Sequence, residues 1–418
     1  KISLRQRNPP TFSPSLHFTL LPLFLPPSMA TPFPADIERE ILLRLPAKTL
    51  RRFTTVCKSW HSLITDPVFI SKFHRRSPRL LLLKHPFDPF TGTTLAHFSF
   101  SSESFDEGPS TPFTPHLDHH HHDHLLLPRH VELVSSNSVN GIVCVVVHLG
   151  LPNGPVNQCD MYLWDASIGK TVKVPASDVT GLFVGHPMVK FYAGFGYDEN
   201  RDDYKVLRVA YLDSVHATVE VFSVREFSWR KLVMAPHSDI LSNILWAGSM
   251  CTFVNGVGYW GAFGFEMKDR FFILGFVFGR EGFKKIRLPE ECIDGREMRY
   301  QSLWVFKGLL ALSVLHFAEF DSNCTRQYIW VRMVLEGVKK PQWVRLFNID
   351  LEGAPRRPVA SLMNGNVLLL GEGDGDHVLY DPELEQVKSL DIFDVDSVVP
   401  YVESLVSFDR LLPSWCST

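Results

Sequence analysis

The chain has few of the features that mark secreted, membrane-spanning or strongly charged proteins. Its seven cysteines include no C-x-x-C pair, which argues against a disulfide framework or structural zinc site and favours a reducing compartment. The longest apolar run, Phe271 to Phe278, is far shorter than the roughly 20 residues of a membrane-spanning helix. The charges of the 42 basic and 45 acidic residues nearly cancel, so the chain has no overall positive potential to attract nucleic acid or an anionic membrane. We expect a protein of the cytoplasm and/or the nucleus, with no nucleic-acid or membrane partner.

Motifs for catalysis and cofactor binding are also missing. No G-x-S-x-G, no H-E-x-x-H and no Cys/His pair at catalytic spacing appears. The segment 169–171 ends like a phosphate-binding loop, but Trp164 stands where such a loop needs glycine, so we expect a hairpin turn. Asp198, Asp202 and Asp203 suggest acid–base or metal chemistry, yet their polar surroundings predict a solvated loop. We predict no catalytic residue, no metal site and no cofactor.

What the chain does have is a large apolar and aromatic content. Its 418 residues are 45% hydrophobic and include 32 phenylalanines and 9 tryptophans. This composition excludes disorder of the whole chain and predicts two or three domains, or a small module beside a large one.

The first residues carry no coherent pattern. Residues 1–28 contain no acid, and an apolar stretch from Leu16 to Leu25 is broken by proline. A secretory signal or an organelle transit peptide is one interpretation. We expect instead that Met29 is the true start and that residues 1–32 form a disordered or untranslated extension. Residues 409–418 are expected to be a tail.

Residues 33–76 have the periodicity of short helices. Asp36 is expected to cap the first helix, and Pro46 to end it. Apolar residues fall on one face of each of the first two helices: Ile37, Ile41, Leu42 and Leu45, then Leu50, Phe53, Cys57, Trp60 and Ile64. About 40 residues bury too little surface to be stable alone, so this module needs cover from the downstream domain or from another polypeptide.

The segment from Phe33 to His74 resembles an F-box almost from end to end. The match includes Phe33-Pro34, the segment 56–60 with sequence VCKSW, and the spacing of Ile64, Asp66-Pro67 and Phe69. The resemblance implies docking onto the SKP-family adaptor of a cullin-based ubiquitin ligase. It implies that the following residues face the adaptor or form the core of the module, and the sequence leaves these two roles open: Phe33, Pro34, Ile37, Ile41, Leu42, Leu45, Pro46, Leu50, Val56, Cys57 and Trp60.

From residue 130 onward, a unit of about 50 residues recurs. Its aromatic centres lie at 164, 222, 277, 330 and 380, and each is followed by a turn and a short segment with basic residues. Repeats of this length with several strands each are typical of propeller blades, whose sheets bury both faces by stacking around a ring. Five repeats are visible, and 80–100 with a strand at 401–408 is expected to add about one more.

Residues 79–408 resemble the F-box-associated domain of plant F-box proteins, a kelch-like interaction domain. Gly194 to Asp198, Val219 to Ser223, Val378 to Pro382 and Tyr401 to Leu405 carry the resemblance. Within this region, residues 101–128 are expected to form a loop rich in His, Pro and Ser. Its histidines could bind a metal opportunistically, but a solvated loop is the better interpretation.

The predicted fold class is therefore α+β and multidomain: a small all-α F-box module, then an all-β propeller-like domain of about six blades. The resemblances imply a non-catalytic substrate-recognition subunit of an SCF-type (cullin-RING) ubiquitin ligase, which reaches cullin and RING subunits through the adaptor. Its target protein and substrate-binding residues are not assigned. A scaffold that binds the adaptor without causing degradation is the alternative, and a propeller enzyme is a weaker one.

Overall fold

The structure is a computed structural model in which the chain divides into two compact units, residues 1–44 and 45–418. The residues that it describes are 34–74, 79–85, 87–88, 93–94, 96–102, 105, 108–113, 127–150, 156–177, 190–211, 217–233, 238–242, 244–248, 250–265, 271–292, 300–317, 324–352, 356–371, 377–390, 392 and 395–405. The predicted extension 1–32, the predicted tail 409–418 and the histidines of the predicted loop lie outside the described residues.

Short helices occupy the region predicted to be helical. They are α1 (Ala35–Leu43), α2 (Ala47–Phe53), α3 (Lys58–Ile64) and α4 (Pro67–His74). Pro34 is the N-cap of α1, so the prediction that Asp36 caps this helix is wrong; Asp36 lies in the first turn and pairs with Arg39 at 3.6 Å. Proline suits a helix start because its missing N–H would have no intrahelical acceptor there.

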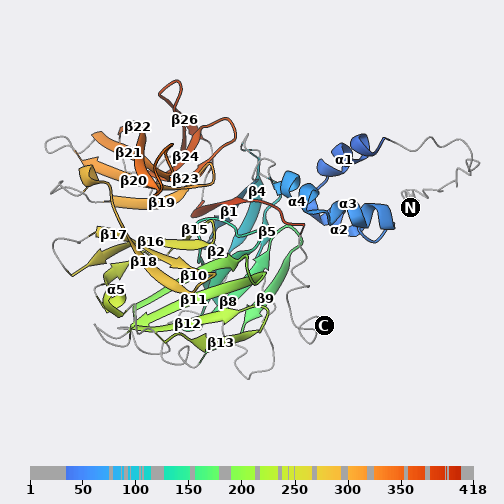
Figure 1. Ribbon diagram of the computed structural model, residues 1–418, viewed down its shortest axis with the longest axis horizontal. Helices are drawn as coiled ribbons and strands as arrows, with labels where there is room; N and C mark the ends of the chain where they lie inside the picture. The colour runs from blue at the N-terminus through green and yellow to red at the C-terminus, as the bar shows by residue number, and fades with distance from the viewer. Residues whose placement is uncertain are drawn as a thin grey trace, which may run out of the picture. The chain divides into compact units, whose positions relative to one another are not determined.

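Six antiparallel sheets follow and form a six-bladed β-propeller (Figure 1). In sheet order, blade 1 is β27 (Ser397–Tyr401), β1 (Arg79–Lys84), β4 (His97–Ser101) and β5 (Thr111–Pro112). Blade 2 is β6 (Leu127–Leu133), β7 (Val143–Gly150), β8 (Val156–Asp165) and β9 (Lys170–Val174), and blade 3 is β10 (Lys190–Asp198), β11 (Asp203–Tyr211), β12 (Ala217–Ser223) and β13 (Ser228–Lys231).

The second half of the propeller repeats this plan. Blade 4 is β14 (Ile244–Ala247) and β15 (Thr252–Val254), both paired with β16 (Val257–Gly264), then β17 (Phe271–Val277) and β18 (Gly282–Arg287). Blade 5 is β19 (Tyr300–Phe306), β20 (Leu309–Phe317), β21 (Cys324–Met333) and β22 (Gln342–Glu352), and blade 6 is β23 (Arg356–Ser361), β24 (Val367–Gly371), β25 (His377–Asp381) and β26 (Gln386–Leu390). A hairpin of β2 (Phe87–Asp88) and β3 (Thr93–Thr94), helix α5 (Ser238–Ser242) and a 3-10 turn at Glu290–Cys292 complete the described elements.

The hydrophobic core lies between the blades. Each of the six main clusters of buried residues joins two neighbouring sheets, and the sixth joins blade 6 to blade 1. Strand β1 shows the reason: Leu81 and Leu83 face blade 2, whereas Leu80 and Leu82 face blade 6. A strand with both faces buried reads as an unbroken apolar run because successive side chains point to opposite faces.

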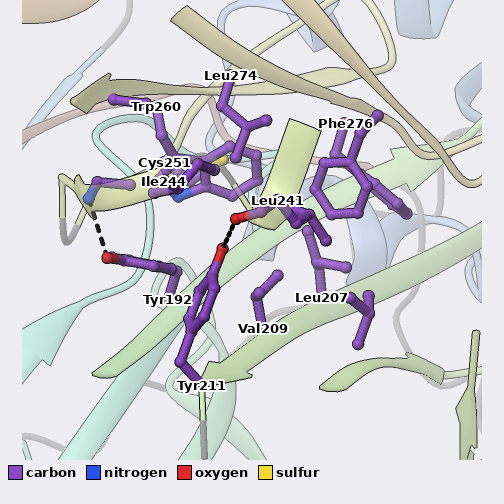
Figure 2. Packing of buried hydrophobic residues seen from close by; sticks show 14 of the residues in the cluster. Tyr192, Leu207, Val209, Tyr211, Leu241, Ile244, Cys251, Trp260, Leu274 and Phe276 are labelled. Atoms are coloured by element: carbon purple, nitrogen blue, oxygen red, sulfur yellow. Dashed lines mark hydrogen bonds between the residues drawn. The ribbon is translucent and has the colours of Figure 1, made fainter. Parts of the chain in front are cut away.

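The cluster between blades 3 and 4 shows how buried polar atoms are satisfied within this core (Figure 2). The hydroxyl of Tyr211 donates to the carbonyl of Leu241 at 3.0 Å, and the hydroxyl of Tyr192 accepts from the backbone N–H of Ala247 at 3.0 Å. Both tyrosines therefore fill the core with their rings while their polar ends keep a partner.

The repeat predicted from the sequence corresponds to the last two strands of each of blades 2 to 6. The aromatic centres lie in β8, β12, β17, β21 and β25, and the segments with basic residues form the edge strands β9, β13, β18, β22 and β26. The segment 169–171 ends the turn between β8 and β9 and begins β9, with Gly169 at φ 72°, so the predicted hairpin is confirmed.

Blade 1 is built from both ends of the propeller. Strand β27 pairs with β1 in the register Leu81↔Val399, which closes the ring. The closing strand was predicted at 401–408, but β27 ends at Tyr401, and residues 402–405 are not in a strand. In the observed pairing of β27 with β1, the side chains of Val398, Val399 and Tyr401 are buried. Burial of these side chains decides the register of the two strands.

Candidate functional site

Helix α1 exposes apolar side chains on one side. Ile37 and Ile41 lie one turn apart, and each has 49% of its surface exposed. Leu42, by contrast, is buried. Residues four apart on a helix are neighbours, so the two isoleucines form one continuous apolar stripe.

The turn between α2 and α3 carries a third exposed apolar residue. Val56 is 62% exposed and precedes Cys57, whose thiol accepts a hydrogen bond from the backbone N–H of Trp60 and so caps α3. The half-buried Trp60 packs on Phe53 of α2 with ring centroids 4.8 Å apart. Leu50 on the same helix is fully buried.

Within the unit 45–418, α2 is tied to the propeller by charged contacts. Arg51 lies 2.8 Å from the fully buried carboxylate of Asp165 at the end of β8, and it donates to the carbonyl of Ser404 at 2.7 Å. The backbone N–H of Ala47 donates to Glu403 at 2.8 Å. These contacts use residues beside the closing strand β27, so α2 is anchored where the ring closes.

Asp165 is also held from within the propeller. Its carboxylate accepts a 2.6 Å hydrogen bond from Ser167 and lies 3.2 Å from the hydroxyl of Tyr401, which donates to the carbonyl of Gly141 at 2.8 Å. At Gly141, where φ is 78°, an added Cβ would lie 2.6 Å from Ser404. Glycine is therefore required here by both backbone conformation and close approach.

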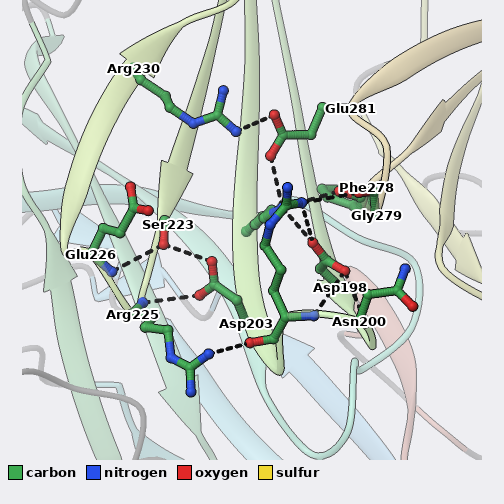
Figure 3. A network of polar contacts seen from close by, with 12 residues as sticks. Asp198, Asn200, Asp203, Ser223, Arg225, Glu226, Arg230, Phe278, Gly279 and Glu281 are labelled. Carbon is green, nitrogen blue, oxygen red and sulfur yellow. Dashed lines mark hydrogen bonds and ion pairs between the residues drawn. The ribbon is translucent and has the colours of Figure 1, made fainter.

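A second group of charged residues joins blades 3 and 4 (Figure 3). The buried ammonium of Lys205 lies 2.7 Å from Asp198 and 2.7 Å from Glu281, and it also donates to the carbonyl of Phe278 at 3.2 Å. Arg230 pairs with the other oxygen of Glu281. All three N–H groups of Lys205 therefore have acceptors, as a buried ammonium requires.

The pKa values of these carboxyls follow from their contacts. Burial acts to raise the pKa of Asp198, but hydrogen bonds from Lys205 and Arg201 outweigh it and leave the pKa below its ordinary value. Glu281 shows the same balance, with Lys205 and Arg230 lowering its pKa against burial. Both groups are therefore ionised partners of a structural cluster near neutral pH.

This cluster corrects the prediction of a solvated acidic loop for Asp198 and Asp203, whereas Asp202 is exposed as predicted. Asp198 and Asp203 are buried, and Asp203 accepts hydrogen bonds from the Ser223 hydroxyl at 2.6 Å and the Arg225 backbone N–H at 3.0 Å. Burial raises the pKa of Asp203. The sequence did not indicate that these carboxylates are buried, because the turn is rich in polar residues and the partners of the carboxylates lie elsewhere in the sequence.

The comparisons with known proteins agree with this architecture. Residues 33–72 match the F-box domain model, and residues 90–363 match the model of the F-box associated beta propeller domain. The second match covers more than half of the chain. The chain belongs to the F-box-associated β-propeller family.

Relatives of this family member include Arabidopsis thaliana F-box proteins. An F-box/kelch-repeat protein is 29% identical over 285 residues, covering 67% of this chain and 71% of its own. The F-box protein CPR1 is 25% identical over 398 residues, covering 88% and 86%. Among solved structures, AofleA from Arthrobotrys oligospora shares 10% identity at a TM-score of 0.37, covering 78% of this chain and 91% of its own. This TM-score is too low to support an inference.

The structure places the predicted F-box residues in three groups. Phe33 lies outside the described residues, and the half-buried residues are Leu45 and Trp60. The buried residues are Leu42 and Leu50. The exposed residues are Pro34, Ile37, Ile41, Pro46, Val56 and Cys57.

Sequence reasoning missed two features of the F-box region. Val68 at the start of α4 is 61% exposed and extends the set of exposed apolar residues. The contacts of Arg51 with Asp165 and Ser404 were also missed, because these partners lie far away in the sequence.

In the part of the chain that the structure describes, no group of three or more His, Cys, Asp or Glu residues is placed to hold a metal ion. No helix among the described residues is both long and apolar enough to cross a membrane.

Proposed function

We propose that this chain is the substrate-recognition subunit of an SCF-type ubiquitin ligase. The F-box binds the SKP-family adaptor, and through it the cullin and RING subunits, while the propeller holds a target protein. Holding the target close to the ubiquitin-loaded enzyme raises the effective concentration of its lysines. In this role the chain performs no bond chemistry itself, and it works in the cytoplasm, the nucleus or both.

The observation that carries this proposal is the exposure of large apolar side chains in the F-box region. Ile37, Ile41 and Val56 are about half exposed or more, although each is large enough to gain about 1.5–3 kcal/mol from full burial. The family assignment supports the same partner, since residues 33–72 match the F-box domain.

Copurification tests the proposal. Full-length tagged protein from plant cells should bring down both the adaptor and the cullin. The Val56→Asp variant should lose both, because a carboxylate cannot be buried in an apolar contact without a partner. Val387→Asp, at a 45% exposed position on the edge strand β26 of blade 6, is the matched control and should retain both. Absence of the adaptor from the wild-type sample contradicts the proposal.

A second measurement separates a ligase subunit from a scaffold that binds the adaptor without causing degradation. Proteins that proximity labelling finds beside both the full-length chain and Val56→Asp are the candidate targets, because the variant leaves the propeller unchanged. Their abundance should rise when the adaptor is depleted. Bound proteins whose ubiquitination and abundance do not change on adaptor depletion favour the scaffold.

A further inference from the structure

Cys159 has an imidazole directly beside it. It lies on β8 of blade 2, and its partner across the β7–β8 pairing is His148. The Cys159 Sγ atom is 3.2 Å from His148 Nδ1. The thiol is partly exposed and packs at the margin of the core cluster between blades 2 and 3. The spacing of the two residues in the sequence does not predict this pair, because strand pairing brings them together.

A carboxylate completes the arrangement on the other side of the ring. Glu132 on β6 places Oε2 3.4 Å from His148 Nε2. A carboxylate at Nε2 favours the proton on that nitrogen, so the Nδ1 lone pair faces the thiol and can accept its proton. The contacts with Cys159, then with Glu132, raise the pKa of His148 to about 10 against the opposing effect of burial.

Other charged groups surround the pair from each neighbouring strand. Arg208 on β11 interacts electrostatically with Cys159 from blade 3. His130 on β6 stacks near His148 at 5.8 Å between ring centroids, and burial, followed by the neighbouring His85, lowers the pKa of His130. His130 Nε2 also lies 3.7 Å from Glu132 Oε1, and two further ion pairs, Asp160 with Lys173 and His85 with Asp396, are formed at 2.9 Å.

Four other cysteines, whose side chains the structure describes, lie in different surroundings. Cys144, Cys251 and Cys292 are buried, and burial raises the pKa of each thiol, which makes them poor nucleophiles. Cys57 is exposed at the N-cap of α3. Cys57 therefore serves as an internal reference for an accessible thiol in the same molecule.

We propose that Cys159 is a nucleophilic thiol that hydroperoxides oxidise to sulfenic acid, with His148 as the proton carrier. His148 Nδ1 takes the thiol proton, and the thiolate attacks one oxygen of the peroxide. An S–O bond forms as the O–O bond breaks, so that sulfur is oxidised and the peroxide is reduced. The leaving hydroxide or alkoxide takes the proton back from His148 and departs as water or alcohol.

Site-resolved labelling of the full-length protein tests this proposal. The protein is treated with limiting hydrogen peroxide at pH 7, sulfenic acid is trapped with dimedone, and each cysteine is quantified by peptide mass spectrometry. We expect Cys159 to be labelled about tenfold faster than Cys57, and His148→Gln to lower the Cys159 rate about tenfold while leaving Cys57 unchanged. A Cys159 rate no higher than that of Cys57, or unaffected by His148→Gln, overturns the proposal.

A pH profile separates proton transfer from a merely structural role of His148. Alkylation of wild-type Cys159 by iodoacetamide should depend less on pH between about 6 and 8 than alkylation of the His148→Gln variant, because His148 Nδ1, 3.2 Å from the sulfur, takes the thiol proton. In His148→Gln the rate should climb steeply with pH. If thermal unfolding shows that His148→Gln is not folded, Glu132→Gln provides the second test. This substitution removes only the charge beside His148 Nε2, and it should shift the pH profile of Cys159 alkylation to higher pH. Parallel profiles in wild type and the folded variant contradict the proposal.

Discussion

At the scale of single residues, the propeller depends on buried charges whose partners come from different blades. Lys205 joins Asp198 of blade 3 to Glu281 beyond β17 of blade 4. The hydrophilic run from Asp198 to Asp203 predicted a solvated loop, since sequence shows composition but not distant partners. The buried aromatic residues were easier to predict, because Trp164 and Phe222 lie in strands with regular apolar patterns.

Replacing Lys205 with methionine should destabilise the propeller. The substitution preserves most of the side-chain volume but leaves Asp198 and Glu281 without their shared cation, which costs about 3–5 kcal/mol for a broken buried ion pair. Chemical denaturation measures the loss. Lys231→Met, on the exposed edge strand β13, is the matched control and should change stability by less than about 0.5 kcal/mol. Equal effects of the two substitutions would show that the buried cluster is not stabilising.

The same cluster should make stability depend on acid pH. The pKa values of Asp198 and Glu281 are lower in the folded protein than their ordinary values, so their contribution is complete above about pH 4–5. It is lost as the pH falls through the lowered folded-state values. Denaturation midpoints measured from about pH 6 to 3 should fall less steeply in Lys205→Met than in wild type, and identical slopes would contradict this origin.

At the scale of elements, the strands were predictable where their pattern repeats and harder to place where the ring closes. The aromatic centres identified five blades, whereas β27 was predicted several residues too late, because its register depends on pairing with β1 at the other end of the domain. The attachment of α2 could not be predicted either, since Arg51 meets Asp165 and Ser404 only in the folded chain.

Removing the Arg51 side chain should loosen α2 from the propeller. In Arg51→Ala, the fully buried Asp165 loses a cation at 2.8 Å, and the local opening free energy of α2 should fall by about 3 kcal/mol. Hydrogen exchange of the α2 amides measures this change. Arg52→Ala tests the neighbouring exposed arginine of the same helix and should leave exchange nearly unchanged. Unaltered exchange in Arg51→Ala would show that the ion pair does not anchor the helix.

At the scale of the whole molecule, the propeller is a ring whose stability depends on its last strand. Val399 and Tyr401 of β27 are fully buried against β1, β4 and blade 2. Each blade buries both faces against its neighbours, so an open ring exposes the apolar faces on both sides of the gap.

Ending the chain after residue 394 should therefore abolish cooperative folding. The lost strand removes a main-chain pairing and several buried apolar residues, which together approach the roughly 5–15 kcal/mol stability of a typical domain. Calorimetry or circular dichroism on heating should show no sharp transition. A chain that ends after residue 408 retains β27 and is the control. Cooperative unfolding of both chains would contradict the role of β27 in closing the ring.

The most direct test of the whole account is the affinity of the purified full-length chain for a purified SKP-family adaptor. We predict that the double substitution Ile41→Asp with Val56→Asp weakens binding by at least about 100-fold, because two apolar side chains lose their burial. Val387→Asp should bind like the wild type, and all three proteins should show the same thermal unfolding of the propeller. Wild-type-like affinity in the folded double variant would contradict the claim that these exposed side chains dock the adaptor.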